Sequence, residues 1–240
     1  MSESNSSTNT ALDDLFSESS AVENLTVELP SRGIGYRNIP GEVTIKCLTF
    51  EDEKYLANIK DSTEVINDLI KRSTDIEDPE ELYLFDKMFL LVMLRKASFG
   101  EKIKMQTACP ICGEENNLEI DIDGLPVEYL EQDFNGLFEV ELEDLNKTAK
   151  VRLPVSSDQK YMTSKDSILD NLWRFVTDIG GYNQAPIISA AIKKLTSRDI
   201  KSLIDVLKVD DYGIQTRATY VCVQCKSKNK VFIPFTESFF

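Results

Sequence analysis

The feature that most restricts how this chain can fold is a matched pair of cysteine motifs in a sequence without histidine. Cys109 and Cys112 enclose Pro-Ile, and Cys222 and Cys225 enclose Val-Gln. Two Cys-x-x-Cys motifs are typical of a tetrahedral zinc site, in which four thiolates fill the coordination shell and leave no position for a substrate. The lack of histidine excludes His-ligated metals, Ser-His-Asp triads and imidazole acid–base catalysis. The motifs therefore indicate a structural Zn²⁺ site.

The segments around both motifs have the pattern of short strands. After the first motif, Leu118, Ile120 and Ile122 alternate with acidic residues, which is typical of a half-buried strand. Apolar residues also flank the second motif on both sides. A hairpin around each motif predicts a zinc ribbon, although residues 113–221 separate the two motifs, far more than the roughly 15–20 residues that are common in ribbons. We therefore expect a ribbon that is split by a large insertion.

Two other interpretations of the cysteines remain open from the sequence. A redox dithiol like that of thioredoxin places one motif at the start of a helix, whereas here there are two motifs between strand-like segments. Two disulfides need an oxidising compartment, and the polar, acidic N-terminus does not resemble a signal peptide. The fifth cysteine, Cys47, shares a predicted strand face with Val43 and Ile45 and is interpreted as a small core residue rather than a reactive thiol.

These patterns predict an α+β fold with a helical core, short antiparallel strands and a split zinc ribbon with four cysteine ligands. The chain is predicted to have three divisions: a disordered acidic tail (1–28), a strand with helices (29–108) and a ribbon region (109–240). Within the ribbon region, residues 109–125 and 214–240 form the split ribbon, and residues 126–213 form the inserted α/β segment.

Apolar residues surround the segment 79–97 on almost every side, which predicts a helix at the centre of the core. Its mid-helix charges, Asp86 and Lys87, are assigned to an edge that reaches solvent. In the insertion, alternation over residues 137–142 predicts a strand, and residues 157–178 are predicted to be helical.

The formal net charge of −14 argues against binding to nucleic acid, because phosphate backbones repel an acidic surface. Lys226, Lys228 and Lys230 alternate after the second motif and are interpreted as a solvated face. No apolar run approaches the roughly 20 residues that a bilayer span needs. The sequence therefore predicts a protein that binds neither nucleic acid nor a membrane.

No enzymatic motif is present. The chain lacks a G-x-S-x-G elbow, a Walker loop and a dinucleotide-binding glycine motif. Its carboxylates gather at predicted helix ends and turns, where acidic residues have structural reasons to occur. We therefore predict that the protein is not an enzyme and that its function depends on its surfaces.

Two terminal segments carry apolar residues that are candidates for docking to a partner. Leu12, Leu15 and Phe16 would share one side of a helical turn, and Phe239 and Phe240 end the sequence. The alternatives are a chance apolar patch in the tail and a C-terminal segment that folds back onto the ribbon.

Several segments in order resemble the baseplate hub assembly proteins of contractile-tailed phages of the T-even type. They are Leu29–Gly33, Leu48–Glu53, Ser98–Gly100, Cys109–Gly113, Arg152–Pro154, Cys222–Cys225 and Ile233–Phe240. The resemblance implies a hub component or assembly factor that contacts other baseplate hub proteins, in the host bacterial cytoplasm during assembly or in the virion tail baseplate. Only the four cysteines are carried over as site residues. The competing class is a zinc-ribbon factor of transcription or translation that binds nucleic acid or a polymerase.

Overall fold

The computed structural model describes residues 24–56, 62–207 and 212–233. The helices are α2 (Phe50–Leu56), α3 (Ser62–Ser73), α4 (Leu84–Phe99), α5 (Lys165–Asn171), α6 (Ala185–Ile192) and α7 (Ser197–Val206). The strands are β1 (Leu25–Glu28), β2 (Glu42–Ile45), β3 (Lys102–Ala108), β4 (Glu115–Asp121), β5 (Val127–Glu128), β6 (Leu137–Leu142), β7 (Lys147–Arg152), β8 (Val176–Ile179), β9 (Gly213–Ile214), β10 (Arg217–Val221) and β11 (Lys228–Phe232). Short 3-10 turns are η1 (Pro79–Glu81), η2 (Ile122–Gly124), η3 (Ser156–Tyr161) and η4 (Leu172–Arg174).

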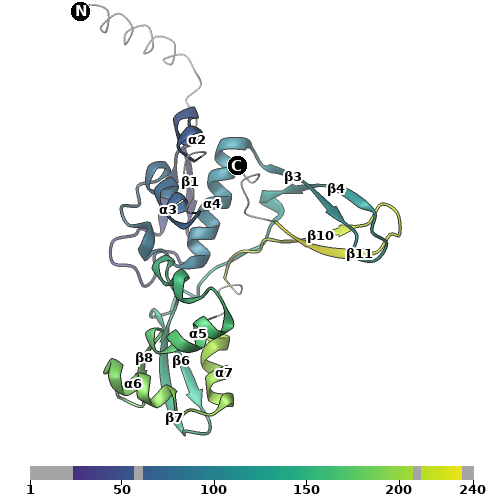
Figure 1. Cartoon of the computed structure of the whole chain (residues 1–240). Helices are drawn as coiled ribbons and strands as arrows, with labels where there is room; N and C mark the ends of the chain where they lie inside the picture. Colours follow the sequence, from purple (N-terminus) through teal and green to yellow (C-terminus); the bar gives the residue numbers. More distant parts are fainter. Residues whose placement is uncertain (1–23, 57–61, 208–211, 234–240) are drawn as a thin grey trace, which may run out of the picture.

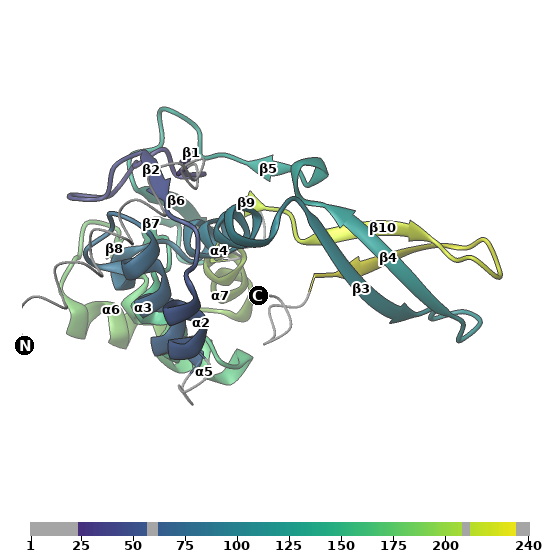
Figure 2. The same cartoon turned by 90° about the horizontal axis from the view of Figure 1, so that it is seen from above.

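Three parts are visible in the described chain: a body around α4, a lobe built on β6–β8, and an arm of two hairpins that projects from the body (Figures 1 and 2). All strand pairs within the described residues are antiparallel, in one three-stranded sheet and several two-stranded ones. The chain is therefore a mixture of helices and short antiparallel strands, as its sequence predicts.

Helix α4 is the centre of the body, and most of its residues from Phe85 to Leu94 are buried. It ends where Gly100 takes a left-handed backbone conformation with φ of 88°, which glycine adopts without steric cost. The helix starts later than predicted. Pro79 opens a 3-10 turn, and Tyr83 forms an isolated bridge with Val155 before α4 begins.

Strand β1 corrects the predicted boundary of the tail, which placed residues 25–28 in a disordered segment. These residues pair with β2 in a regular antiparallel register. The side chains of Leu25 and Val27 pack against the core cluster that contains α4. The acidic composition of the segment concealed this strand because only its alternate residues are apolar.

Asp86 is buried, which contradicts its assignment to a solvent-reaching edge. Its side chain is 0% exposed and accepts hydrogen bonds from the Ser31 backbone N–H at 3.0 Å and from the Tyr36 hydroxyl at 2.7 Å. The Tyr36 hydroxyl in turn accepts a bond from the backbone N–H of Tyr83. Asp86 therefore ties the segment after β1 to the first turn of α4.

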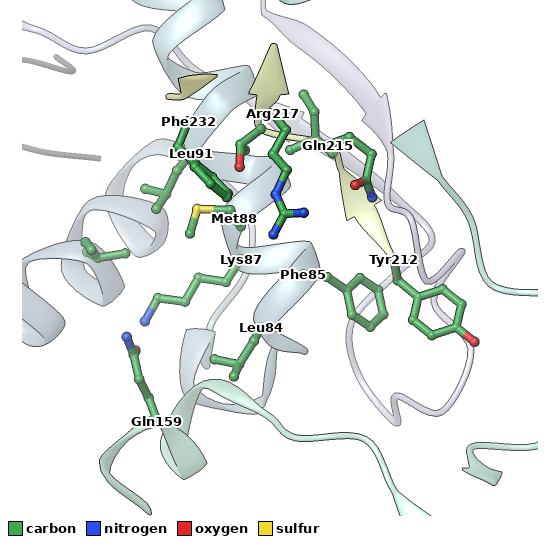
Figure 3. A pocket seen from close by; sticks show the side chains of 13 residues that line it. Leu84, Phe85, Lys87, Met88, Leu91, Gln159, Tyr212, Gln215, Arg217 and Phe232 are labelled. Carbon is green, nitrogen blue, oxygen red and sulfur yellow. The ribbon is translucent and has the colours of Figure 1, made fainter. Parts of the chain in front are cut away.

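Lys87 is also buried, and its ammonium group donates to the Ser156 hydroxyl at 2.7 Å. It lines a cavity of about 540 Å³ beside α4 (Figure 3). Lys87 and Gln159 lie at one end of this cavity, and Arg217 and Phe232 lie at the other. Burial lowers the pKa of Lys87 to about 8.

The lobe places the three-stranded sheet β6–β7–β8 against α6 and α7. The predicted helix over residues 157–178 is wrong. That stretch contains η3, α5 and η4, and it ends in β8, where Val176 and Ile179 are buried on the edge of β7. A short apolar run has no periodicity that distinguishes a buried strand from a helix, so pairing with β7 decides the outcome.

An aromatic cluster lies where the body meets the lobe. Its buried members Tyr83 and Phe85 come from the start of α4, and Leu153 follows β7. The rings of Tyr83 and Phe85 stack with centroids 5.4 Å apart. The lobe therefore joins the body through packed side chains as well as through its connecting segments.

Candidate metal centre

The first cysteine motif forms the turn of the hairpin β3–β4. Cys109 follows β3 directly, and its backbone N–H donates to the carbonyl of Glu114 at 2.8 Å. The N–H of Gly113 donates back to the carbonyl of Cys109 at 2.9 Å. Gly113 has φ of 76°, so the turn closes through a residue type that tolerates this conformation. The two bonds direct both cysteine side chains of the motif to one side of the turn.

The second motif forms the turn of the hairpin β10–β11 and repeats the same two hydrogen bonds. The N–H of Cys222 donates to the carbonyl of Ser227 at 3.0 Å, and the N–H of Lys226 donates to the carbonyl of Cys222 at 3.1 Å. Lys226 occupies the position of Gly113 and also has a positive φ, of 58°. Both motifs therefore form the same turn, at the far end of the arm (Figure 2).

The structure brings the four predicted site residues together. The sulfur atoms of Cys109, Cys112, Cys222 and Cys225 all lie within 4.8 Å of one another. The Cys109 and Cys225 sulfurs are 3.7 Å apart, as are those of Cys112 and Cys222. Four sulfurs at about 2.3 Å from a tetrahedral zinc are about 3.8 Å from one another. The donor set and its spacing therefore fit a metal ion such as Zn²⁺.

The structure also bears on the two other interpretations of the cysteines, a redox dithiol and a pair of disulfides. All five cysteines are free thiols in the structure, so neither motif is closed by a disulfide. Both motifs lie in hairpin turns and neither begins a helix, unlike the dithiol motif of a thioredoxin. Cys109 and Cys222 are buried whereas Cys112 and Cys225 are exposed.

Two asparagines that the sequence analysis did not single out reach across to the sulfurs. The Asn116 side-chain amide lies 3.8 Å from the Cys222 sulfur, and that of Asn229 lies 3.5 Å from the Cys109 sulfur. Each asparagine is buried and faces the first cysteine of the other hairpin. The oxygen of Asn116 also accepts a 2.9 Å bond from the N–H of Val223. Both asparagines occupy the same place in the pattern Cys-x-x-Cys-x-x-x-Asn, a repeat that is readable in the sequence.

The thiols differ in acidity. The backbone N–H of Cys112 lowers the pKa of Cys109 to about 6, with help from the Ser227 hydroxyl. The hydroxyl of Ser227 is also the main cause of the lowered pKa of Cys225. At Cys112 the backbone N–H of Glu114 lowers the pKa, but desolvation and the three neighbouring sulfurs outweigh it and raise the pKa to about 12. Four thiolates this close repel one another, and a divalent cation would offset that repulsion.

The remaining candidate residues lie apart from this cluster. Cys47 follows β2 and is half-buried, whereas the sequence predicts a small buried core residue, and its thiol faces the carbonyl of Ala97 at 2.9 Å. The predicted docking residues fall outside the described part of the chain: Leu12, Leu15, Phe16, Phe239 and Phe240.

Among the described residues, no helix combines the length and apolar character needed to cross a membrane. A family model described as T4 bacteriophage base plate protein matches residues 22–240 of the chain. The matched range contains the body, the lobe and both hairpins of the arm. The comparisons with curated proteins and with solved structures gave no match.

Proposed function

Because the chain belongs to the family of T4 bacteriophage base plate proteins, we propose that it is a component or assembly factor of the baseplate's central hub. In this role it contacts other baseplate hub proteins and catalyses no reaction. The family match carries the proposal, since it spans residues 22–240 and so includes every described part of the molecule. The order of motifs that resembles hub assembly proteins supports the narrower assignment to the hub.

The proposal includes one structural Zn²⁺ held by Cys109, Cys112, Cys222 and Cys225. The sulfur spacing supports it, because two pairs 3.7 Å apart match the edges of a zinc tetrahedron. Four thiolates leave no open coordination position, which suits an ion that joins two hairpins rather than one that activates a substrate. The bound ion would hold the arm in a fixed shape.

The hub role is tested in cells infected with a phage that lacks this gene and supplied with a tagged copy of the protein. We expect other baseplate hub proteins to copurify with the tagged chain, identified by mass spectrometry, and complete baseplates to form. A chain that restores infection yet copurifies with transcription or translation proteins in place of baseplate proteins would contradict the proposal.

The metal is tested separately by elemental analysis of the purified protein. We expect one zinc per chain, and loss of that zinc in the double variant C112S/C225S, which changes the two exposed cysteines. Purified protein without metal, in which all four thiols react freely with a thiol reagent, would refute the metal site and leave the hub role standing.

A further inference from the structure

The second hairpin of the arm differs in charge from the rest of the chain. Residues 212–233 contain Arg217, Lys226, Lys228 and Lys230 but no aspartate or glutamate, although the whole chain has a net charge of −14. In the structure, most of these cations lie on one face of the hairpin β10–β11.

That face is defined by the register of β10 and β11. Residues paired directly across the two strands share a face of the hairpin. The exposed face consists of Arg217 paired with Phe232, Thr219 paired with Lys230, and Val221 paired with Lys228. We call these six residues the basic face. The opposite face carries Val231, which belongs to the cluster that also contains Ile103 and Ile120 of the first hairpin, and Ala218 and Tyr220, which pack against that cluster.

The cations of the basic face have no acidic partner among the described residues. Arg217 stacks over the Phe232 ring at 4.5 Å, and Lys228 and Lys230 form no ion pair there. On the first hairpin, by contrast, Lys102 pairs with Glu119 at 2.6 Å. Phe232 is 58% exposed and Val221 is 54% exposed. The basic face therefore offers unneutralised positive charge beside apolar side chains, which complements a ligand that is both acidic and apolar.

The N-terminal segment of the chain has that composition. Residues 1–23 lie outside the described structure and contain no lysine or arginine. Their acidic residues include Asp13, Asp14 and Glu18, which surround Leu15 and Phe16. A chain spans roughly 3.3 Å per residue when extended, so Asp13 can reach about 40 Å from residue 25.

We propose that the basic face binds the acidic N-terminal segment, residues 1–23, of the same chain. Tethering makes even a weak contact effective, because two sites of one chain that a short connection can span meet at a local concentration in the millimolar range. The apolar side chains of the segment cover Val221 and Phe232, and its carboxylates pair with Lys228 and Lys230. This inference is independent of the hub role and of the identity of the metal.

The test compares amide NMR spectra of the full-length chain with those of two matched variants. D13N/D14N removes two carboxylates from the N-terminal segment, and E131Q/D133N removes two from exposed positions in the lobe's connecting segment. We expect D13N/D14N to shift the amides of residues 217–232, and E131Q/D133N to leave them unchanged. The D13N/D14N shifts should resemble those produced in the wild-type chain by 1 M salt, where the screening length is about 3 Å.

A second test changes the charges of the basic face instead of those of the N-terminal segment. Its readout is the rate of limited proteolysis at the bond after Phe16. K228E/K230E should increase the initial cleavage rate several-fold, whereas K193E/K194E, the same charge change at exposed lysines of the lobe, should not. Zinc content and melting temperature of K228E/K230E must match the wild type for this comparison.

Three outcomes would overturn the proposal. The first is an unchanged hairpin spectrum in D13N/D14N. The second is a hairpin spectrum that depends on protein concentration over a twenty-fold range, because the contact would then join two copies. The third is micromolar binding of random-sequence duplex DNA to the same amides at 0.15 M salt, because the face would then be a nucleic-acid site.

Discussion

Asn116 and Asn229 show how closely the sulfur cluster depends on residues other than cysteine. Each amide faces the first cysteine of the opposite hairpin, so the two hairpins hold each other's sulfurs in place. The cysteines could be predicted from their spacing alone, because the Cys-x-x-Cys pattern needs no knowledge of the fold. The asparagines share a spacing too, but their role depends on which hairpin faces which, and that is a tertiary property.

We predict that N116D weakens zinc binding by about 10- to 100-fold, as is usual when a group that supports a metal ligand is changed. Aspartate keeps an oxygen for the Val223 N–H but loses the N–H group that faces the Cys222 sulfur, and it adds a negative charge there. Competition with a chromophoric chelator measures the affinity. N117D, at the exposed neighbouring position, serves as the control, and equal losses in both variants would contradict the prediction.

Asp86 should make stability depend on pH. Burial raises its pKa to about 6, against bonds from Ser31 and Tyr36 that lower it, whereas an unfolded aspartate titrates near 3.9. The folded state therefore retains a proton that the unfolded state releases between about pH 4 and pH 6. The stability that this retained proton contributes is fully present below the unfolded-state pKa of Asp86 and is lost as the pH rises through its folded-state pKa.

We therefore expect the free energy of unfolding of the wild type to rise by about 1 kcal/mol relative to D86N between pH 7 and pH 5. Denaturant unfolding at both pH values measures it. The D86N chain corrects for all other titrating groups, including the thiols. Parallel pH profiles of the two proteins would show that Asp86 titrates normally.

Among the elements, those with strong local signals were predictable and those that depend on pairing were not. The apolar residues around α4 identified it as the central helix. Strand β8 was mistaken for helix because its strand conformation depends on pairing with β7, which the local sequence does not show. Strand β1 was missed for the same reason, since β2 and the body supply its partners.

Two N-terminal deletions test how much strand β1 contributes to the stability of the protein. Removing residues 2–22 should change the melting temperature by no more than about 2 °C, because it leaves β1 intact. Removing residues 2–28 should lower it by roughly 5–10 °C, since it also removes β1 and the packing of Leu25 and Val27, on the order of 2–3 kcal/mol in a chain of this size. Calorimetry measures both. Equal melting temperatures for the two deletions would show that β1 contributes nothing to stability.

At the scale of the whole molecule, the lobe has its own hydrophobic cluster, whereas the cluster of the body continues into the arm through Ile103, Ile120 and Val231, and the two hairpins of the arm also meet at the four sulfurs. The sequence predicted two hairpins linked by one ion and an insertion between them. It did not predict that the insertion forms a separate packed lobe or that the arm projects from the body. Both features depend on contacts between distant segments, such as the aromatic cluster around Tyr83.

We predict that chelating the metal loosens the arm and leaves the lobe folded. Isolated two-stranded hairpins are marginally stable in water, so β3–β4 and β10–β11 depend on the apolar packing that they share and on the metal that links their turns. Hydrogen-exchange mass spectrometry should show faster exchange at residues 102–121 and 217–232 after chelation. The sheet β6–β7–β8 is the internal control, and an equal increase in its exchange rate would contradict the prediction.

The long separation between the two motifs also has a consequence for synthesis on the ribosome. Cys112 and Cys222 are 110 positions apart in the chain. At about 5–20 residues per second, the first pair of thiols emerges roughly 5–20 s before the second pair has been made. During that interval the nascent chain carries half of a metal site and a hairpin without its partner. The arm can therefore be completed only in chains whose translation has reached the second hairpin. A prematurely terminated chain would have no complete arm.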